Sequence, residues 1–140
     1  MHRLERARLL LAASACTCVL CSDSSTLTST LRGVAPLLQW LDAGRTFPDY
    51  AAADRVVGSG AAFLYILLGI RAVHAEVISR PALDLLLSHG IDVTFTQLTD
   101  SIINRAGTGP CPIESAVRGL SDPAEALAAI RRTLLQLNAN

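Results

Sequence analysis

The residues best suited to chemistry gather in one stretch of the sequence, Ile102 to Ser115. It combines an amide, a guanidinium, a hydroxyl, a thiol and a carboxylate among two glycines and two prolines: Asn104, Arg105, Thr108, Cys111 and Glu114. Neither a helical nor a strand period runs through it, so we predict a shaped loop that leads into a helix from Pro112. Loops of this kind carry function more often than regular elements do.

An anion is the ligand that this loop favours. The planar fork of Arg105 matches a carboxylate or a phosphate. Backbone N–H groups at Gly107, Thr108 and Gly109 are expected to face the same anion. We therefore expect Asn104 and this glycine-flanked segment to bind a small anionic metabolite.

Cys111 is a candidate nucleophile, because it precedes Pro112 and is expected at the N-cap of the next helix. The helix dipole there favours a thiolate. Glu114 falls at the third helical position, where its carboxylate also interacts favourably with the helix dipole. A thiolate at Cys111 would then be a second negative charge nearby, which the carboxylate would repel. A small buried cap is the alternative for Cys111. The candidate catalytic residues are Cys111, Glu114 and Asp54.

A second set of residues resembles the zinc-deaminase signature, in which His-x-Glu is followed by Pro-Cys-x-x-Cys. His74 and Glu76 stand at the right spacing and Cys111 follows a proline, but Glu114 occupies the place of the second cysteine. The chemistry also requires His-x-Glu at a helix start, whereas this one falls in a predicted strand. We therefore predict no metal ligands and no cofactor, with Glu76 as the expected partner of a half-buried His74. A zinc-dependent deaminase using His74, Glu76 and Cys111 is kept as an alternative.

The composition predicts one domain, residues 1–140, able to bury a sound core. Hydrophobic residues make up 51% and charged residues 17%, and 12 basic and 12 acidic side chains give a formal net charge of +0. This balance argues against nucleic-acid or membrane-surface binding through bulk charge. Every basic residue is arginine, which excludes a Schiff-base lysine or a Walker-A lysine in this chain.

Three of the four cysteines, Cys16, Cys18 and Cys21, lie close together without a second pair to complete a zinc site. We predict reduced, buried cysteines in a cytoplasmic protein, with Cys16 and Cys18 on one strand face and Cys21 on the other. A secretory segment is the alternative for the N-terminus, but Glu5 interrupts its basic part and the apolar part is short. No apolar run is long enough for a transmembrane helix.

Hydrophobic periods and turn residues predict helices that alternate with strands. The helices are expected at 3–13, 33–43, 54–68, 79–90, from 112, and at 122–137. The strands are expected at 17–20, 26–30, 71–78 and 91–95, with a linker or short strand at 47–53. Asp54 is the expected N-cap of its helix, with Gly58 and Gly60 inside it. Those glycines indicate either close helix packing or a nearby ligand.

The order of these elements predicts a three-layer α/β/α sandwich whose mixed sheet opens with an antiparallel hairpin. Ligands of such sheets bind outside the carboxyl ends of the parallel strands. Ser79, Ser59 and Gly58 are therefore expected to share one site with the loop after Phe95.

The whole chain resembles an uncharacterised prokaryotic family, a domain of unknown function with a cytidine-deaminase-like fold. The resemblance rests on motifs spread from the first helix to the last: Arg32-Gly33-Val34 with Pro36-Leu37-Leu38, Ala53-Asp54-Arg55-Val56-Val57-Gly58, Ala75-Glu76-Val77-Ile78-Ser79 with Pro81-Ala82-Leu83, Ile102-Ile103-Asn104-Arg105, Gly107-Thr108-Gly109 and Cys111-Pro112. It implies the fold without its zinc ligands. The helix from Asp54 lacks His/Cys-Ala-Glu, and the helix at Ser79-Arg80-Pro81 lacks Pro-Cys-x-x-Cys. The family usually carries a basic residue where Ser59 stands, so any role of that basic residue in the family is not expected of this chain.

Three hypotheses for the function follow. The first is a zinc-independent enzyme, or former enzyme, acting on a nucleotide-like or phosphorylated metabolite. The second is a non-catalytic ligand sensor that uses the same pocket. The third is a structural or interaction domain in which Asn104 and Arg105 satisfy backbone groups of the last helices. Neither nucleic acid nor a membrane is an expected partner, and homo-oligomerisation stays open.

Overall fold

The computed structural model describes residues 2–104 and 106–139, so Arg105, the predicted anion ligand, lies outside the described residues. The described chain is a mixed α/β fold with six helices and five strands. The helices are α1 His2–Ala13, α2 Ala35–Asp42, α3 Ser59–Leu68, α4 Arg80–Ser88, α5 Pro112–Val117 and α6 Pro123–Ala139. The strands are β1 Cys18–Cys21, β2 Thr26–Ser29, β3 Ala51–Val57, β4 Ala72–Ser79 and β5 Asp92–Thr99.

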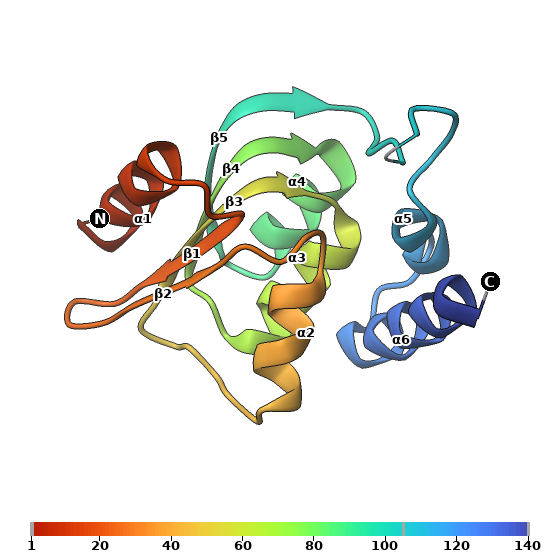
Figure 1. Cartoon of the computed structure of the whole chain (residues 1–140), viewed down its shortest axis with the longest axis horizontal. Helices are drawn as coiled ribbons and strands as arrows, with labels where there is room; N and C mark the ends of the chain where they lie inside the picture. The colour runs from red at the N-terminus through yellow and green to blue at the C-terminus, as the bar shows by residue number, and fades with distance from the viewer. Residues whose placement is uncertain (1, 105, 140) are drawn as a thin grey trace.

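The five strands form one sheet in the order β2-β1-β3-β4-β5. Strand β1 pairs antiparallel with β2 and β3, which confirms the predicted opening hairpin. Strands β3, β4 and β5 are parallel neighbours, joined by the helical crossovers α3 and α4. Their carboxyl ends therefore meet at one edge of the sheet, beside the N-termini of α3 and α4 (Figure 1).

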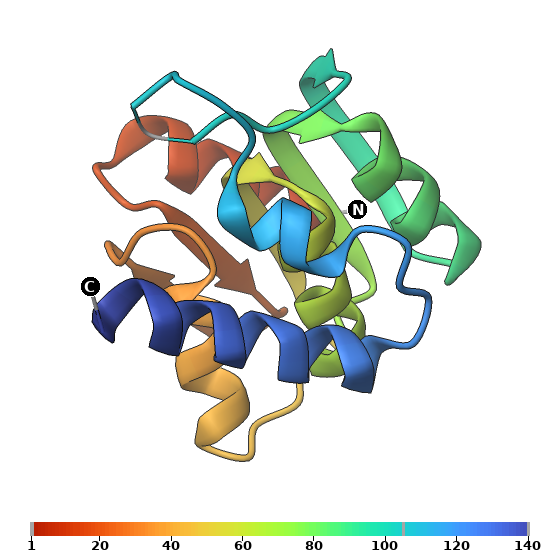
Figure 2. The same ribbon diagram turned by 90° about the vertical axis from the view of Figure 1, so that its right-hand side faces the viewer.

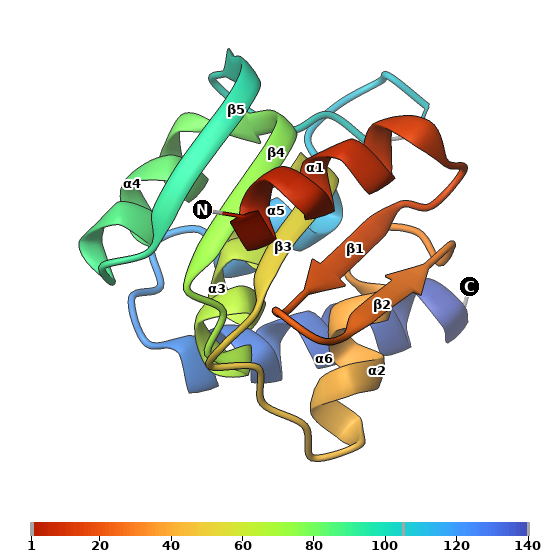
Figure 3. The same cartoon turned by 90° about the vertical axis from the view of Figure 1, so that its left-hand side faces the viewer.

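Helices cover both faces of the sheet. Helix α1 lies on one face, against β1 and β3 (Figure 3). Helices α3 and α4 pack together on the other face, with α2 beside α3. Helices α5 and α6 pack on each other and on α3, where α6 crosses the outer side of the domain (Figure 2). The α3 side of the sheet is thus covered more deeply than the α1 side.

Helix α3 is buried because it lies between the sheet and the last two helices. Its sequence, SGAAFLYILL, is apolar nearly all round, and seven of its ten residues are buried. A helix of this composition belongs inside a protein rather than at its surface. Gly69 ends it in the left-handed conformation, at φ 77°, as a glycine does at many helix ends.

The prediction that Asp54 caps a helix is wrong. Asp54 lies inside β3, and α3 begins five residues later at Ser59, with Gly58 as the N-cap. The strand continues through Arg55 to Val57, since the β-branched residues Val56 and Val57 favour extended backbone. The sequence 47–53 is accordingly a linker followed by the first half of a central strand.

The cysteines divide between the two faces of the sheet. Cys18 belongs to the core on the α3 side, whereas Cys21 packs with Ala7 and Leu11 of α1. Cys16 precedes the strand and packs on the α1 side, so its predicted place beside Cys18 is wrong. No helix of the described residues is long and apolar enough to cross a bilayer.

Candidate functional site

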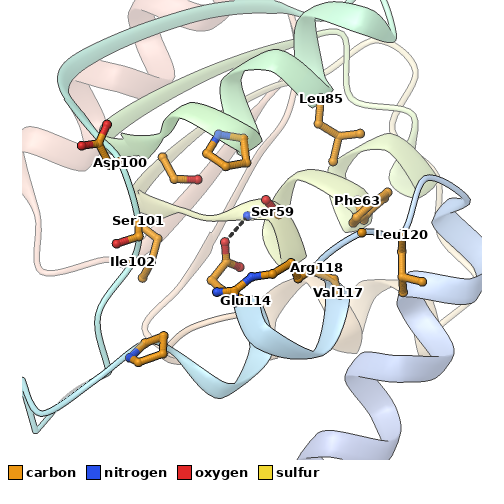
Figure 4. A pocket seen from close by; sticks show the side chains of 14 residues that line it. Ser59, Phe63, Leu85, Asp100, Ser101, Ile102, Glu114, Val117, Arg118 and Leu120 are labelled. Carbon is orange, nitrogen blue, oxygen red and sulfur yellow. Dashed lines mark hydrogen bonds between the residues drawn. The ribbon is translucent and has the colours of Figure 1, made fainter.

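A cavity of about 320 Å³ opens where the parallel strands end. It lies among the N-termini of α3 and α4, the segment after β5, and α5 (Figure 4). Its lining combines serines, two carboxylates and one guanidinium with apolar side chains: Ser59, Phe63, Ser79, Pro81, Leu85, Asp100, Ser101, Ile102, Pro110, Glu114, Val117, Arg118, Gly119 and Leu120. Sequence analysis placed a site at this edge and named three of these residues, Ser59, Ser79 and Glu114.

Glu114 binds the N-terminus of α3. Its carboxylate accepts a hydrogen bond from the backbone N–H of Ser59 at 2.5 Å (Figure 4) and another from the backbone N–H of Gly60 at 2.9 Å. These are two of the N–H groups that a helix start leaves without partners, and the positive end of the helix dipole favours the carboxylate. The side chain predicted to act in catalysis therefore caps a buried helix that lies far away in the sequence.

Gly58 and Gly60 allow this approach. A Cβ atom at Gly58 would lie 2.4 Å from Cδ of Glu114, and one at Gly60 would lie 2.5 Å from Cγ2 of Ile113. Both separations are far below van der Waals contact, so α5 reaches the start of α3 only because both residues are glycine. Of the two interpretations of these glycines, close helix packing accounts for the contacts.

Ser79 also serves a helix start. Its hydroxyl oxygen accepts a hydrogen bond from the backbone N–H of Ala82 at 3.3 Å, and it is the N-cap of α4. This confirms the predicted start of that helix. Ser79 is buried at the cavity wall. Ser59 interacts with Glu114 through its backbone N–H and not through its side chain.

The segment between β5 and α5 closes on itself. Ile103 and Pro110 form an antiparallel bridge, and the N–H of Asn104 donates to the carbonyl of Gly109 at 2.8 Å. The side chain of Asn104 accepts from the N–H of Thr108 at 3.0 Å and donates to its hydroxyl at 3.2 Å. Asn104 and Thr108 therefore hold the turn, and Gly107 supplies its left-handed residue, at φ 70°.

This segment separates the first cavity from a second one. Ile102 and Pro110 line the first cavity, whereas their chain neighbours Ile103 and Cys111 line the second. The second cavity, of about 970 Å³, lies between α2, the end of β3, the start of α5 and the last turns of α6. The predicted site residues were expected to share one pocket, but Asn104 and Cys111 line this second cavity. Among the described residues, neither cavity is lined by Gly58, Gly107, Thr108, Gly109 or Asp54.

Asp54 belongs to a buried polar chain under the sheet. The hydroxyl of Tyr65 donates to its carboxylate at 2.6 Å, and Sγ of Cys18 lies 3.2 Å from the same hydroxyl. Burial raises the pKa of Asp54 to about 7, although the hydrogen bonds from Tyr65 and from the backbone N–H groups of Val56 and Arg55 oppose that rise. Burial also raises the pKa of both Tyr65 and Cys18 well above their ordinary values.

His74 and Glu76 lie apart from Cys111. His74 is the register partner of Ala53, which packs with Ala7 and Leu11 of α1, so His74 lies on the α1 face, whereas Cys111 packs on the α3 face. Burial lowers the pKa of His74, and Arg8 of α1 lowers it further. Nδ1 of His74 shares a 2.8 Å hydrogen bond with the hydroxyl of Thr94. Among the described residues, no group of three His, Cys, Asp or Glu side chains is arranged to hold a metal ion.

Glu76 forms an ion pair of 2.9 Å with Arg55 and, among the described contacts, no hydrogen bond with His74, although its charge raises the pKa of His74. Arg55 also donates to the carbonyls of Leu11 and Ser14 at 2.8 Å each. A cation is favourable at the carbonyl end of a helix, so Arg55 fastens the end of α1 to the sheet. Sequence analysis assigned Arg55 no role, since the carbonyls that it binds lie about forty residues away in the chain.

Cys111 is the N-cap of α5 and Pro112 its first residue, as predicted. We expect a thiol-alkylating reagent near neutral pH to label Cys111 ahead of Cys18 and Cys21, which are 1% and 0% exposed. Cys16 is half-buried like Cys111 and is the matched comparison, because it lies at no helix start. Peptide mass spectrometry measures the two labelling rates. Faster labelling of Cys111 than of Cys16 would show that the N-cap position makes the thiol reactive, whereas equal rates would mean that solvent exposure alone sets the labelling rate.

The geometry defines a single-sheet α/β domain with a cavity at the carboxyl ends of its parallel strands. In this cavity the carboxylate of Glu114 binds the N–H groups at the start of α3. The chain belongs to the DUF1893 family (TM1506), a domain of unknown function, whose family model matches residues 6–134. It is similar in structure to a DUF1893 family protein, TM1506, from Thermotoga maritima, with a TM-score of 0.84 and 24% sequence identity over 96% of this chain and 90% of that chain. That likeness shows the fold. A comparison with curated proteins finds no match.

Proposed function

We propose that the protein binds a small metabolite in the first cavity. The observation that supports this is the position of the cavity, outside the carboxyl ends of β3, β4 and β5, where ligands of parallel sheets bind. Its volume of about 320 Å³ falls at the lower end of the range of ligand sites. A mainly apolar wall with a few convergent polar groups is also typical of such sites.

The charges of the lining favour a ligand with one anionic group. Arg118 is the basic side chain among the described residues of the cavity, and Asp100 and Glu114 are the acidic ones. The carboxylate of Glu114 already has the helix start of α3 as its partner, whereas Arg118 is exposed at the rim. A carboxylate or phosphate would bind Arg118 while a planar or apolar body lies against Phe63 and Leu85, which is the shape of a nucleotide-like metabolite.

We further propose a cytidine-deaminase-like fold that works without zinc. The resemblance of the motifs supports it, as does a mixed sheet in which α3 and α4 start at the ends of adjacent parallel strands. Those helix starts read Gly58-Ser59-Gly60 and Ser79-Arg80-Pro81, with no thiol or imidazole among them. Binding without catalysis is favoured over an enzyme, because Cys111, Glu114 and Asp54 lie in three separate surroundings.

A thermal-shift screen of nucleosides, nucleotides and sugar phosphates tests the proposal. A ligand at one hundred times its dissociation constant should add about 2.7 kcal/mol to the free energy of unfolding. Ser101→Trp fills the cavity from an exposed position and should abolish the shift, whereas Ser24→Trp in the β1–β2 turn should not. Arg118→Ala should weaken only the anionic ligands. If no compound stabilises the protein, or if the shift survives Ser101→Trp, a structural or interaction role is the better assignment.

A further inference from the structure

The second cavity, here called the α2–α6 groove, gathers exposed apolar side chains. Of the nine large hydrophobic residues exposed among the described part of the chain, four line it. They are Leu31, Val56, Ile103 and Leu137, with exposed fractions of 42%, 47%, 61% and 48%. Leu38, Ile113 and Leu134 extend the same surface below them. A concave apolar surface of this kind marks a binding site more often than a chance exposure.

The groove is separate from the cavity of the proposed function. The two share no lining residue among those described, because successive residues of the segment between β5 and α5 face opposite sides. Its volume, about 970 Å³, is three times that of the first cavity and falls within the range of small-molecule sites. It is therefore large enough for a ligand with an extended aliphatic part.

The charge on the groove is positive. Arg32 and Asp42 are the charged side chains among its described lining residues. Asp42 accepts a hydrogen bond from Arg131 at 2.7 Å and is thereby compensated. Arg32 forms no ion pair with a described residue, and it is exposed just before α2. The other polar side chains of the lining are neutral amides, so among the described residues Arg32 is a cation without an ion-pair partner at one end of a mainly apolar groove.

We propose that the α2–α6 groove binds an anionic amphiphile, a carboxylate carried on an aliphatic chain. The chain would cover Val56, Ile103 and Leu137, and remove their exposed surface from water. The carboxylate would bind the guanidinium of Arg32, which presents the matching fork of donors. An aliphatic chain suits this surface because most of its lining is apolar, and the exposed side chains that it would cover are all aliphatic.

Isothermal titration calorimetry with decanoate and with decanol, which shares the chain but lacks the charge, tests the proposal. Arg32→Gln should weaken decanoate about tenfold and leave decanol unchanged, since a hydrogen bond to a charged group is lost. Ile103→Gln should weaken both ligands about fivefold through the loss of apolar contact. Leu87→Gln is the matched control, because Leu87 is 53% exposed on α4 and lines neither cavity. It should change nothing.

Three results would overturn the proposal. The first is the absence of saturable decanoate binding to the unmodified protein. The second is an equal loss of affinity in Leu87→Gln, which would mean non-specific adsorption. The third is a dimer in sedimentation that Ile103→Gln dissociates, since the groove would then be an interface between copies of this chain. Ile103 is 61% exposed, so its substitution should leave the fold intact, which a thermal melt verifies.

Discussion

Glu114→Ala is expected to lower the free energy of unfolding by about 2 to 4 kcal/mol. The substitution removes both hydrogen bonds from the carboxylate to the N–H groups of Ser59 and Gly60, and those groups lie at the start of a buried helix. Donors left without a partner in such a place cost more than the bond itself contributed. Urea denaturation followed by circular dichroism measures the loss.

Glu125→Ala is the matched control, because Glu125 is exposed in the first turn of α6 and should change the free energy by less than about 0.5 kcal/mol. Gly58→Ala adds a second test. When Glu114 is present, the Cβ added at position 58 would displace the carboxylate of Glu114, so Gly58→Ala alone should be destabilising. In a Glu114→Ala background the same change should cost much less. Equal costs in the two backgrounds would show that Glu114 does not hold the start of α3.

The stability of the protein is expected to fall as the pH rises from about 4 to 7, because of Asp54. Its pKa is about 7 in the folded protein, against an ordinary value of 3.8. Between these values the folded state keeps a proton that the unfolded state has released. The contribution is therefore fully present below the unfolded pKa and lost as the pH rises through the folded one. The difference between these two pKa values corresponds to roughly 4 kcal/mol.

Chemical denaturation across this pH range, compared between the unmodified protein and Asp54→Asn, isolates the effect from other titrating groups. The decline should be absent from Asp54→Asn and present in Asp92→Asn, whose side chain is exposed at the start of β5. Tyr65→Phe removes the hydroxyl that donates to the carboxylate, so it should raise the pKa of Asp54 and carry the decline to higher pH. Parallel curves for the unmodified protein and Asp54→Asn would contradict the assignment.

The hydrogen bonds of Glu114 to the start of α3 and of Tyr65 to Asp54 limit which groups a ligand of the first cavity can reach. The N–H groups of Ser59 and Gly60 at the start of α3 already bind Glu114, so the anionic ligand that we propose would bind Arg118 instead of this helix start. Asp54 faces Tyr65 in the core and has no access to that ligand. Of the three candidate catalytic residues, Glu114 lines the first cavity, Cys111 lines the second and Asp54 lines neither.

Local signals predicted most of the regular elements. Helix α2 was predicted at 33–43, where the apolar residues Val34, Leu37, Leu38 and Leu41 recur at helical spacing. Gly44 and Gly90, both with positive φ, follow the ends of α2 and α4. Cys111 was predicted as an N-cap from the proline that follows it, and α4 was predicted to start at Ser79 from the neighbouring residues. Each of these signals operates within about one helical turn, so the amino-acid order alone is sufficient.

Only the folded chain could reveal the partners of Asp54, Arg55 and Glu114. Glu114 meets Ser59 across 55 positions of sequence, and Arg55 meets Leu11 across 44. Asp54 was mistaken for a helix cap because aspartate satisfies a helix start and a buried tyrosine hydroxyl equally well, and the choice depends on where α3 packs. The predicted site divides into two cavities for the same reason. Which side of the chain a residue faces between β5 and α5 is set by the Ile103–Pro110 bridge, which closes a short loop, and by the packing of α5 on α3, which joins distant parts of the sequence.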